Sequence, residues 1–137
     1  MPSDSEPAGT PQHWLARAKG HLAMARVPKP DSGFWEDLAF HAQRAAEFAL
    51  KAVYQHRGLV YRFTHNLAEL GTGLENAGLS LPTSVADAVI LTRYAVRARY
   101  PGTSPAVTQE EHAEAIRLAE EVVAWARTQI LGADAPD

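Results

Sequence analysis

The sequence contains no cysteine, so disulfides, thiolate metal ligands and cysteine nucleophiles are all excluded. No apolar run approaches the ~20 residues that a membrane-spanning helix requires. The opening segment, MPSDSEPAGTPQ, has neither the basic start nor the apolar stretch of a signal peptide. These absences predict a cytoplasmic protein that does not engage a membrane.

An excess of positive charge is also missing. The chain has 13 Lys and Arg against 16 Asp and Glu, a net charge of −3, which disfavours nucleic-acid binding through net charge alone. The charge is unevenly spread, because residues 14–62 hold eight basic and four acidic side chains. Residues 110–137 hold seven acids and two arginines. A local basic surface therefore remains open.

β-Branched runs are scarce, while alanine and other helix-forming residues are abundant. At 137 residues, with 46% hydrophobic and 21% charged residues, the chain has the length and composition of one globular domain. The composition therefore predicts an all-α fold.

Start and stop signals divide the chain into about five helices. Thr10-Pro11 and the Thr108/Glu111 capping box are typical of helix starts, and Gly58 and Gly78 are typical of helix ends. Short connections between helices indicate an up-and-down bundle. Residues 1–11 and 132–137 are expected to be tails around a domain at 12–131, with helices at 12–26, from 32 or 33 to 56, 67–77, 85–99 and 109–131.

The segment LTRYAVRARYPGT, residues 91–103, concentrates cations in an acidic chain. Arg93 and Arg97 are one helical turn apart, and Arg99 lies near the helix end. Such cations complement the helix dipole, which is a purely structural explanation. They would equally bind a phosphate or a partner's carboxylate, with Tyr94 and Tyr100 stacking on a base.

Other polar residues carry a structural and a functional interpretation too. Gln43, Glu47 and Lys51 recur every four residues, as a solvated stripe or a polar cluster inside the bundle would. His65 follows Thr64 at a helix start, where a structural role is favoured over acid–base chemistry. The histidines have no metal-ligand spacing, so no metal site is predicted.

Three segments together resemble the HEPN family (higher eukaryotes and prokaryotes nucleotide-binding). They are FHAQRAAEFALKAV at 40–53, FTHNLAEL at 63–70 and LTRYAVRARYPG at 91–102, in the order and at the spacing seen in that family. The resemblance covers residues 13–131. It implies a helical bundle, usually dimeric, in agreement with the helix pattern.

HEPN ribonucleases carry an Arg followed after four to six residues by His, and no arginine of this chain has a histidine in that window. The resemblance then points to small HEPN proteins encoded beside a minimal nucleotidyltransferase. Those proteins are thought to bind nucleotides or to act as its partner in a toxin–antitoxin pair. We therefore expect a homodimeric protein that is not an enzyme and has no cofactor, although a nucleotide such as ATP, RNA or the nucleotidyltransferase would bind it.

Two alternatives stay open. One is a divergent metal-independent ribonuclease, in which His65 and an arginine meet in the fold. The other is a helical dimerisation module without a ligand, in which Arg93 or Arg97 pairs with Glu110, Glu111 or Glu114.

Overall fold

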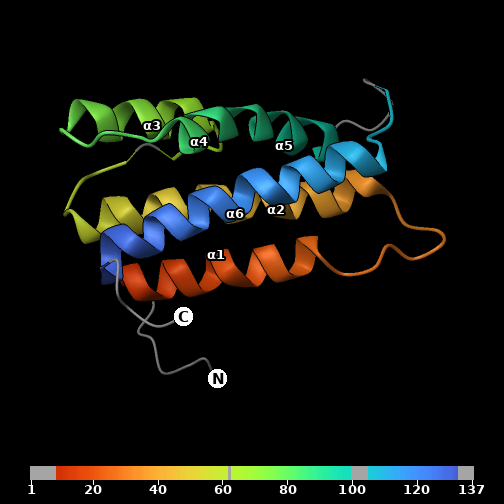
Figure 1. Cartoon of the computed structure of the whole chain (residues 1–137), viewed down its shortest axis with the longest axis horizontal. Coiled ribbons are helices and arrows are strands. Elements are labelled where there is room, and N and C mark those ends of the chain that lie inside the picture. Colours follow the sequence, from red (N-terminus) through yellow and green to blue (C-terminus); the bar gives the residue numbers. More distant parts are fainter. Residues whose placement is uncertain (1–8, 62, 100–104, 133–137) are drawn as a thin grey trace.

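The computed structural model describes residues 9–61, 63–99 and 105–132, and only the backbone of residues 96–99. Most of the two expected tails, and the Pro101-Gly102 pair of the cationic segment, lie outside these ranges. The described residues form helices and no strand, which confirms the all-α fold. Figure 1 shows them in chain order: α1 (Pro11–Ala25), α2 (Trp35–His56), α3 (Leu67–Asn76), α4 (Thr83–Ala86), a 3₁₀ segment η1 (Asp87–Leu91), α5 (Thr92–Arg99) and α6 (Gln109–Leu131).

Side-chain caps are present at three helix starts, and those at Thr10 and at Thr108 with Glu111 were expected. The Thr10 side chain accepts the His13 backbone N–H, and the Asn66 side chain accepts two backbone N–H groups of the first turn of α3. At α6, Thr108 and Glu111 form both bonds of a capping box. Helix α2 begins at Trp35 and not at 32 or 33, because a turn closed by the Gly33 N–H and the Pro30 carbonyl precedes it.

The segment expected as one helix at 85–99 is divided. Residues 87–91 form a 3₁₀ turn between α4 and α5. Val85, Ala88 and Leu91 are buried, and this spacing of three matches the three residues per turn of a 3₁₀-helix. The break allows one apolar row to stay on the core before α5 begins.

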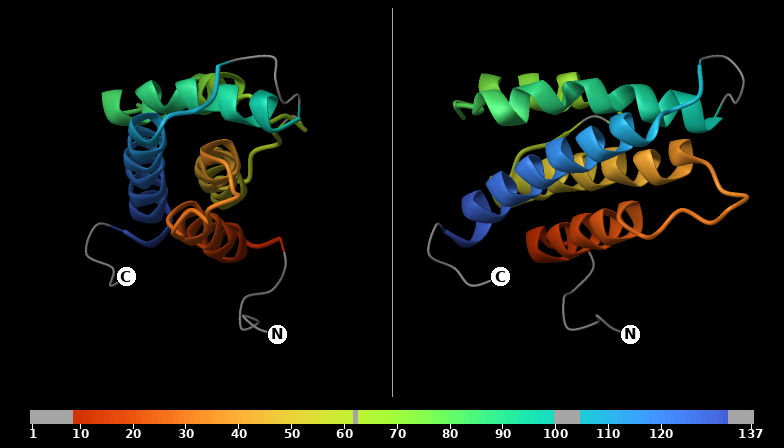
Figure 2. Two further views of the ribbon diagram at one scale, coloured as in Figure 1. Left: turned by 90° about the vertical axis from the view of Figure 1, so that its right-hand side faces the viewer. Right: turned by 45° about the vertical axis from the view of Figure 1, so that its right-hand side comes forward.

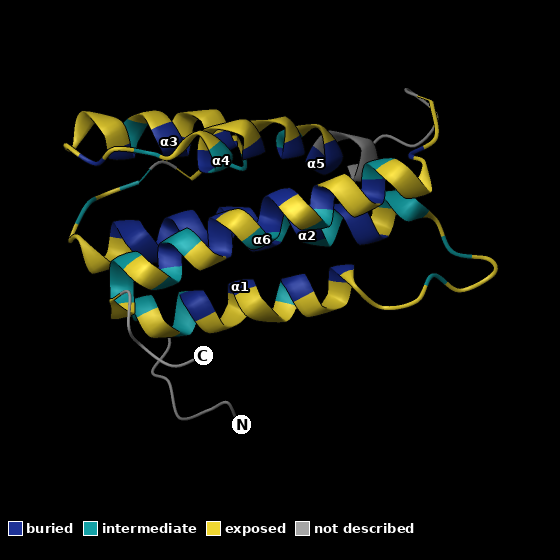
Figure 3. Ribbon diagram, in the orientation of Figure 1, coloured by how far each residue is buried: buried dark blue, intermediate teal, exposed yellow. Residues whose placement is uncertain are grey.

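Helix α2 is the centre of the molecule. Figure 2 shows α1 along one side of α2, α6 along a second and the α3–α5 layer along a third. Helices α1, α3, α5 and α6 all contact α2. The burial colours of Figure 3 show α2 almost wholly buried over its second half. Its small side chains let the neighbouring backbones approach closely, since six alanines are fully buried: Ala39, Ala42, Ala45, Ala46, Ala49 and Ala52.

Candidate functional site

A buried polar cluster lies on the side of α2 that carries Gln43, Glu47 and Lys51. Their exposed fractions are 0, 1 and 5%. Of the two structural interpretations offered by their spacing, the structure therefore shows the cluster inside the bundle. Charged groups so deeply buried need close partners, because removal from water costs several kcal/mol per ion.

Glu47 is the acceptor at the centre of this cluster. Its Oε2 accepts from Lys51 Nζ at 2.7 Å, and its Oε1 lies 2.9 Å from His65 Nδ1. Gln43 Nε2 donates to the same Oε1 at 3.1 Å and to the His65 backbone carbonyl at 3.1 Å. The cluster therefore joins α2 to the residues just before α3.

These partners decide the charge of the carboxyl group. Burial alone would raise the pKa of Glu47, but hydrogen bonds from Lys51 and His65, with the charge of Lys51, outweigh it. The net pKa of Glu47 is lowered, so the group is ionised at neutral pH.

The ionised Glu47 fixes the orientation of His65. A carboxylate only accepts, so His65 Nδ1 carries the proton in this contact and Nε2 is left as an acceptor in the neutral ring. The His65 side chain is 31% exposed, whereas Glu47 is 1% exposed. A buried carboxylate that orients a partly exposed imidazole is an arrangement capable of accepting a proton.

Aromatic rings surround the ammonium group of Lys51. Its Nζ lies 6.0 Å from the ring centroid of Trp14, 5.3 Å from that of Tyr61 and 5.6 Å from that of Phe63. Cation–π attraction to these rings supplements the ion pair with Glu47. The rings also keep Lys51 in the cluster, so it is less able to reach a ligand.

The start of α5 adjoins this cluster. The Leu67 N–H donates to Thr92 Oγ1 at 3.0 Å, which places the first residues of α3 and α5 side by side. Arg93 is exposed, but Tyr94 is 5% exposed and packs in the core, so its ring is not free to stack on a base here. The side chains of Arg97 and Arg99, and the whole of Tyr100, lie outside the described residues.

Acidic side chains lie near Arg93. A cavity of about 250 Å³ between η1 and α6 is lined by Arg93 and by Glu110, Glu111 and Glu114. Glu111 is engaged in the α6 capping box and Glu114 pairs with Arg117. No ion pair joins Arg93 to these three glutamates, all of them described residues, so the pairing expected of Arg93 in a dimerisation module is not found. The pairing expected of Arg97 lies outside the described side chains.

The sequence interpretation missed a second cluster, around Phe48 on α2. The guanidinium carbons of Arg17 and Arg44 lie 5.4 and 4.8 Å from the Phe48 ring centroid, and His21 packs edge-on at 5.0 Å. Within residues 9–61, 63–99 and 105–132, neither arginine has a carboxylate partner. The sequence could have indicated this second cluster by the spacing of three or four residues between its members. These are Trp14, Arg17 and His21 on α1, and His41, Arg44 and Phe48 on α2.

The fold and these clusters define the class as an all-helical bundle with a polar centre on its middle helix. The family model for the HEPN domain matches residues 11–129, so the chain belongs to the HEPN family. A crystal structure of an archaeal HEPN homologue is similar at a TM-score of 0.70 and 24% identity, over 88% of this chain and 98% of that one. This similarity supports the fold. No curated protein matches the sequence significantly.

Among the described residues, no group of three or more His, Cys, Asp or Glu side chains is placed to hold a metal ion. None of the described helices has both the length and the apolar character needed to cross a bilayer.

Proposed function

We propose that this HEPN protein is non-catalytic and binds a nucleotide or another phosphate-bearing ligand. One observation carries the proposal: Arg17 and Arg44 flank Phe48 on the α1–α2 surface without an acidic partner among the described residues. Guanidinium groups held against a ring keep donors free for phosphate oxygens. The missing Arg–His ribonuclease motif supports a role without catalysis.

The electrostatics of the two arginine-bearing surfaces differ. The acid whose charge raises the pKa of His21, in the Phe48 cluster, is Glu47. This carboxylate is already hydrogen-bonded to Lys51 and His65. Three glutamates share the cavity of Arg93 and would repel a phosphate there. A phosphate is therefore favoured on the α1–α2 surface over Arg93.

Calorimetric titration with ATP and with a short RNA tests this proposal. We expect saturable, salt-sensitive binding that an Arg17→Ala/Arg44→Ala variant loses. Lys19→Ala is the matched control, because it removes a charge from an exposed position of α1. If Arg93→Ala abolished binding while the double variant kept it, the ligand site would lie at α5. No binding of either ligand would refute the proposal.

A role as accessory partner of a minimal nucleotidyltransferase is part of the proposal. The family resemblance motivates it, together with the exposed Arg93. Co-expression with a minimal nucleotidyltransferase from the same genome, followed by size-exclusion chromatography, tests it. Separate elution of the two proteins would count against this role without affecting the ligand proposal.

The Glu47–His65 pair favours a second candidate function, a divergent metal-independent ribonuclease. Glu47 orients His65, and the bond between Leu67 and Thr92 brings α5 close to it. Cleavage of RNA in the presence of EDTA, lost in a folded His65→Ala variant, would support this candidate. Undiminished cleavage in that variant, or no cleavage at all, would reject it.

A further inference from the structure

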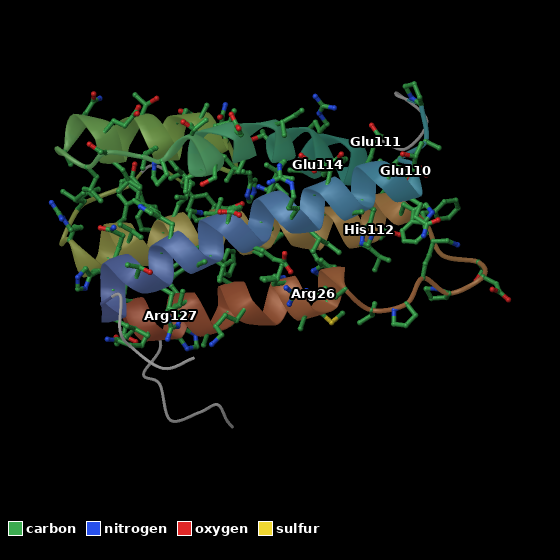
Figure 4. All side chains as sticks on the ribbon, in the orientation of Figure 1. Arg26, Glu110, Glu111, His112, Glu114 and Arg127 are labelled. Atoms are coloured by element: carbon green, nitrogen blue, oxygen red, sulfur yellow. The ribbon has the colours of Figure 1, made fainter. Side chains whose placement is uncertain are left out.

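A separate cavity of about 350 Å³ lies where the α1–α2 connection meets the first turns of α6. Figure 4 shows Arg26, at the end of α1, and His112, on α6, in this part of the molecule. The cavity combines apolar walls with polar and charged groups: Val27, Pro28, Ile116, Arg26, Lys29, Trp35, Gln109 and His112. Its size is at the lower end of the range for small-molecule sites.

His112 supplies a fixed hydrogen-bond acceptor in this cavity. The residue is 8% exposed, and its Nε2 lies 2.7 Å from the Ala25 carbonyl oxygen. A carbonyl only accepts, so Nε2 carries the proton and Nδ1 is an acceptor in the neutral ring. In the described part of the chain, no group bonds to Nδ1, and this atom is not sealed from solvent.

Trp35 supplies a flat apolar wall. Its ring centroid lies 4.8 Å from that of His112, with 38° between the ring planes. The indole is partly exposed, and Trp35 is the first residue of α2. A planar ring of a ligand can therefore stack on Trp35 while its edge reaches His112.

Two cations lie at the same opening. Lys29 Nζ is 5.7 Å from the Trp35 ring centroid and donates to the carbonyls of Pro30 and Gly33, which hold it beside the indole. Arg26 pairs with Glu120, which offsets part of its charge. The lining has these two cations and no carboxylate, so a negative group is favoured there.

We propose that this cavity binds a planar aromatic acid. The ligand's ring stacks on Trp35, an O–H or N–H at its edge donates to His112 Nδ1, and its anionic group lies between Lys29 and Arg26. The site shares no residue with the Arg17–Arg44 surface, so it does not depend on the function proposed above.

The test follows the three tryptophan indole N–H signals by NMR, assigned through single Trp→Phe variants, while 4-hydroxybenzoate is added. This probe has a planar ring, a hydroxyl donor and a carboxylate. We expect a saturable shift of the Trp35 signal and not of the Trp125 signal. The neutral 4-hydroxybenzamide and the non-planar 4-hydroxycyclohexanecarboxylate should each bind about tenfold more weakly, since each lacks one recognised feature.

Variants separate the proposed site from a non-specific effect. Lys29→Gln should weaken 4-hydroxybenzoate about tenfold, whereas Lys19→Gln, on exposed α1 surface, should leave it unchanged. Lys29→Gln is preferred to a His112 variant because glutamine keeps a side-chain donor for the Pro30 and Gly33 carbonyls, whereas a His112 variant would lose the bond to Ala25. Tighter binding of phenyl phosphate would identify the anion as phosphate. No saturable shift at millimolar probe, or equal binding of acid and amide, would overturn the proposal.

Discussion

Glu47 makes three hydrogen bonds from a position that water hardly reaches. Lys51, His65 and Gln43 donate to it, and its exposed fraction is 1%. Replacing a whole buried ion pair by apolar groups is often neutral, but removing one partner leaves an uncompensated buried charge. The cluster is therefore more sensitive to single changes than to paired ones.

We predict that Glu47→Gln lowers the free energy of unfolding by about 3 kcal/mol, because Lys51 stays buried without its anion. Denaturant unfolding measures the change. Glu75→Gln, at an exposed position of α3, should change it by less than about 0.5 kcal/mol. Glu47→Leu/Lys51→Met should recover part of the loss. Equal stability of Glu47→Gln and the parent protein would contradict the prediction.

His21 makes stability depend on pH. Burial, then the nearby His41, Arg44 and Arg17, lowers the pKa of His21 from 6.5 to about 4. The unfolded chain therefore binds more protons than the folded one between these values, and stability falls as the pH drops from 6.5 to about 4. An NMR titration of the His21 ring should have its midpoint near 4. A midpoint at or above 6.5 would show that the ring does not lie in this environment.

The sequence predicts part of these residue-scale features. Four-residue spacing puts Gln43, Glu47 and Lys51 on one side of a helix, as found. Their burial depends on other segments, among them those that bring Trp14 and Tyr61 to Lys51, so no local pattern could predict it. The contact between His65 and Glu47, which are 18 residues apart, likewise depends on how distant segments pack, so no local pattern could predict it.

At the scale of helices, boundaries with capping side chains were predictable, because Thr10, Asn66 and Thr108 act on their own neighbours. The 3₁₀ segment at 87–91 was not. Buried residues at spacings of three fit an α-helix as well as a 3₁₀-helix, so the sequence pattern does not separate them. Contacts of this segment with α6 and α3 decide which helix forms. Local signals therefore set helix ends better than helix type.

Two glycines within helices, Gly73 and Gly20, distinguish the effect of packing on stability from the effect of helix propensity. A Cβ at Gly73 of α3 would clash with the hydroxyl of Tyr54, which donates to the Leu70 carbonyl at 2.6 Å, whereas Gly20 of α1 faces open space. We predict that Gly73→Ala destabilises the protein by about 1–3 kcal/mol. Gly20→Ala should stabilise it by up to about 1 kcal/mol. Thermal unfolding of both variants checks this, and a stabilised Gly73→Ala protein would contradict the fit of Tyr54 against α3.

At the scale of the whole molecule, the bundle buries one helix on nearly every side and leaves apolar side chains on the α2–α3 connection. Val60 is 96% exposed and Phe63 is 97% exposed. Burying such side chains against another chain would be favourable, because it removes apolar surface from water. The expected homodimer would give such residues a partner.

We predict that the purified protein has a mass of about twice 14.9 kDa by light scattering. Phe63→Ser should shift it toward the monomer without loss of helicity, since hydrophobic burial at the interface is lost. Phe34→Ser is the control, because Phe34 is 64% exposed in the α1–α2 connection. A monomeric parent protein would refute the expectation, and an unchanged mass for Phe63→Ser would place the interface elsewhere.

The position of the buried ion pair within a single helix also bears on the folding pathway. Glu47 and Lys51 are one turn apart in α2, so a nascent helix in the unfolded chain already brings them together. The charges can neutralise each other before α1 and the residues around His65 close over them. The two charges are then already paired when most of the water around them is removed. Helix α2 can therefore form early, because it does not need a distant segment to supply a counter-ion.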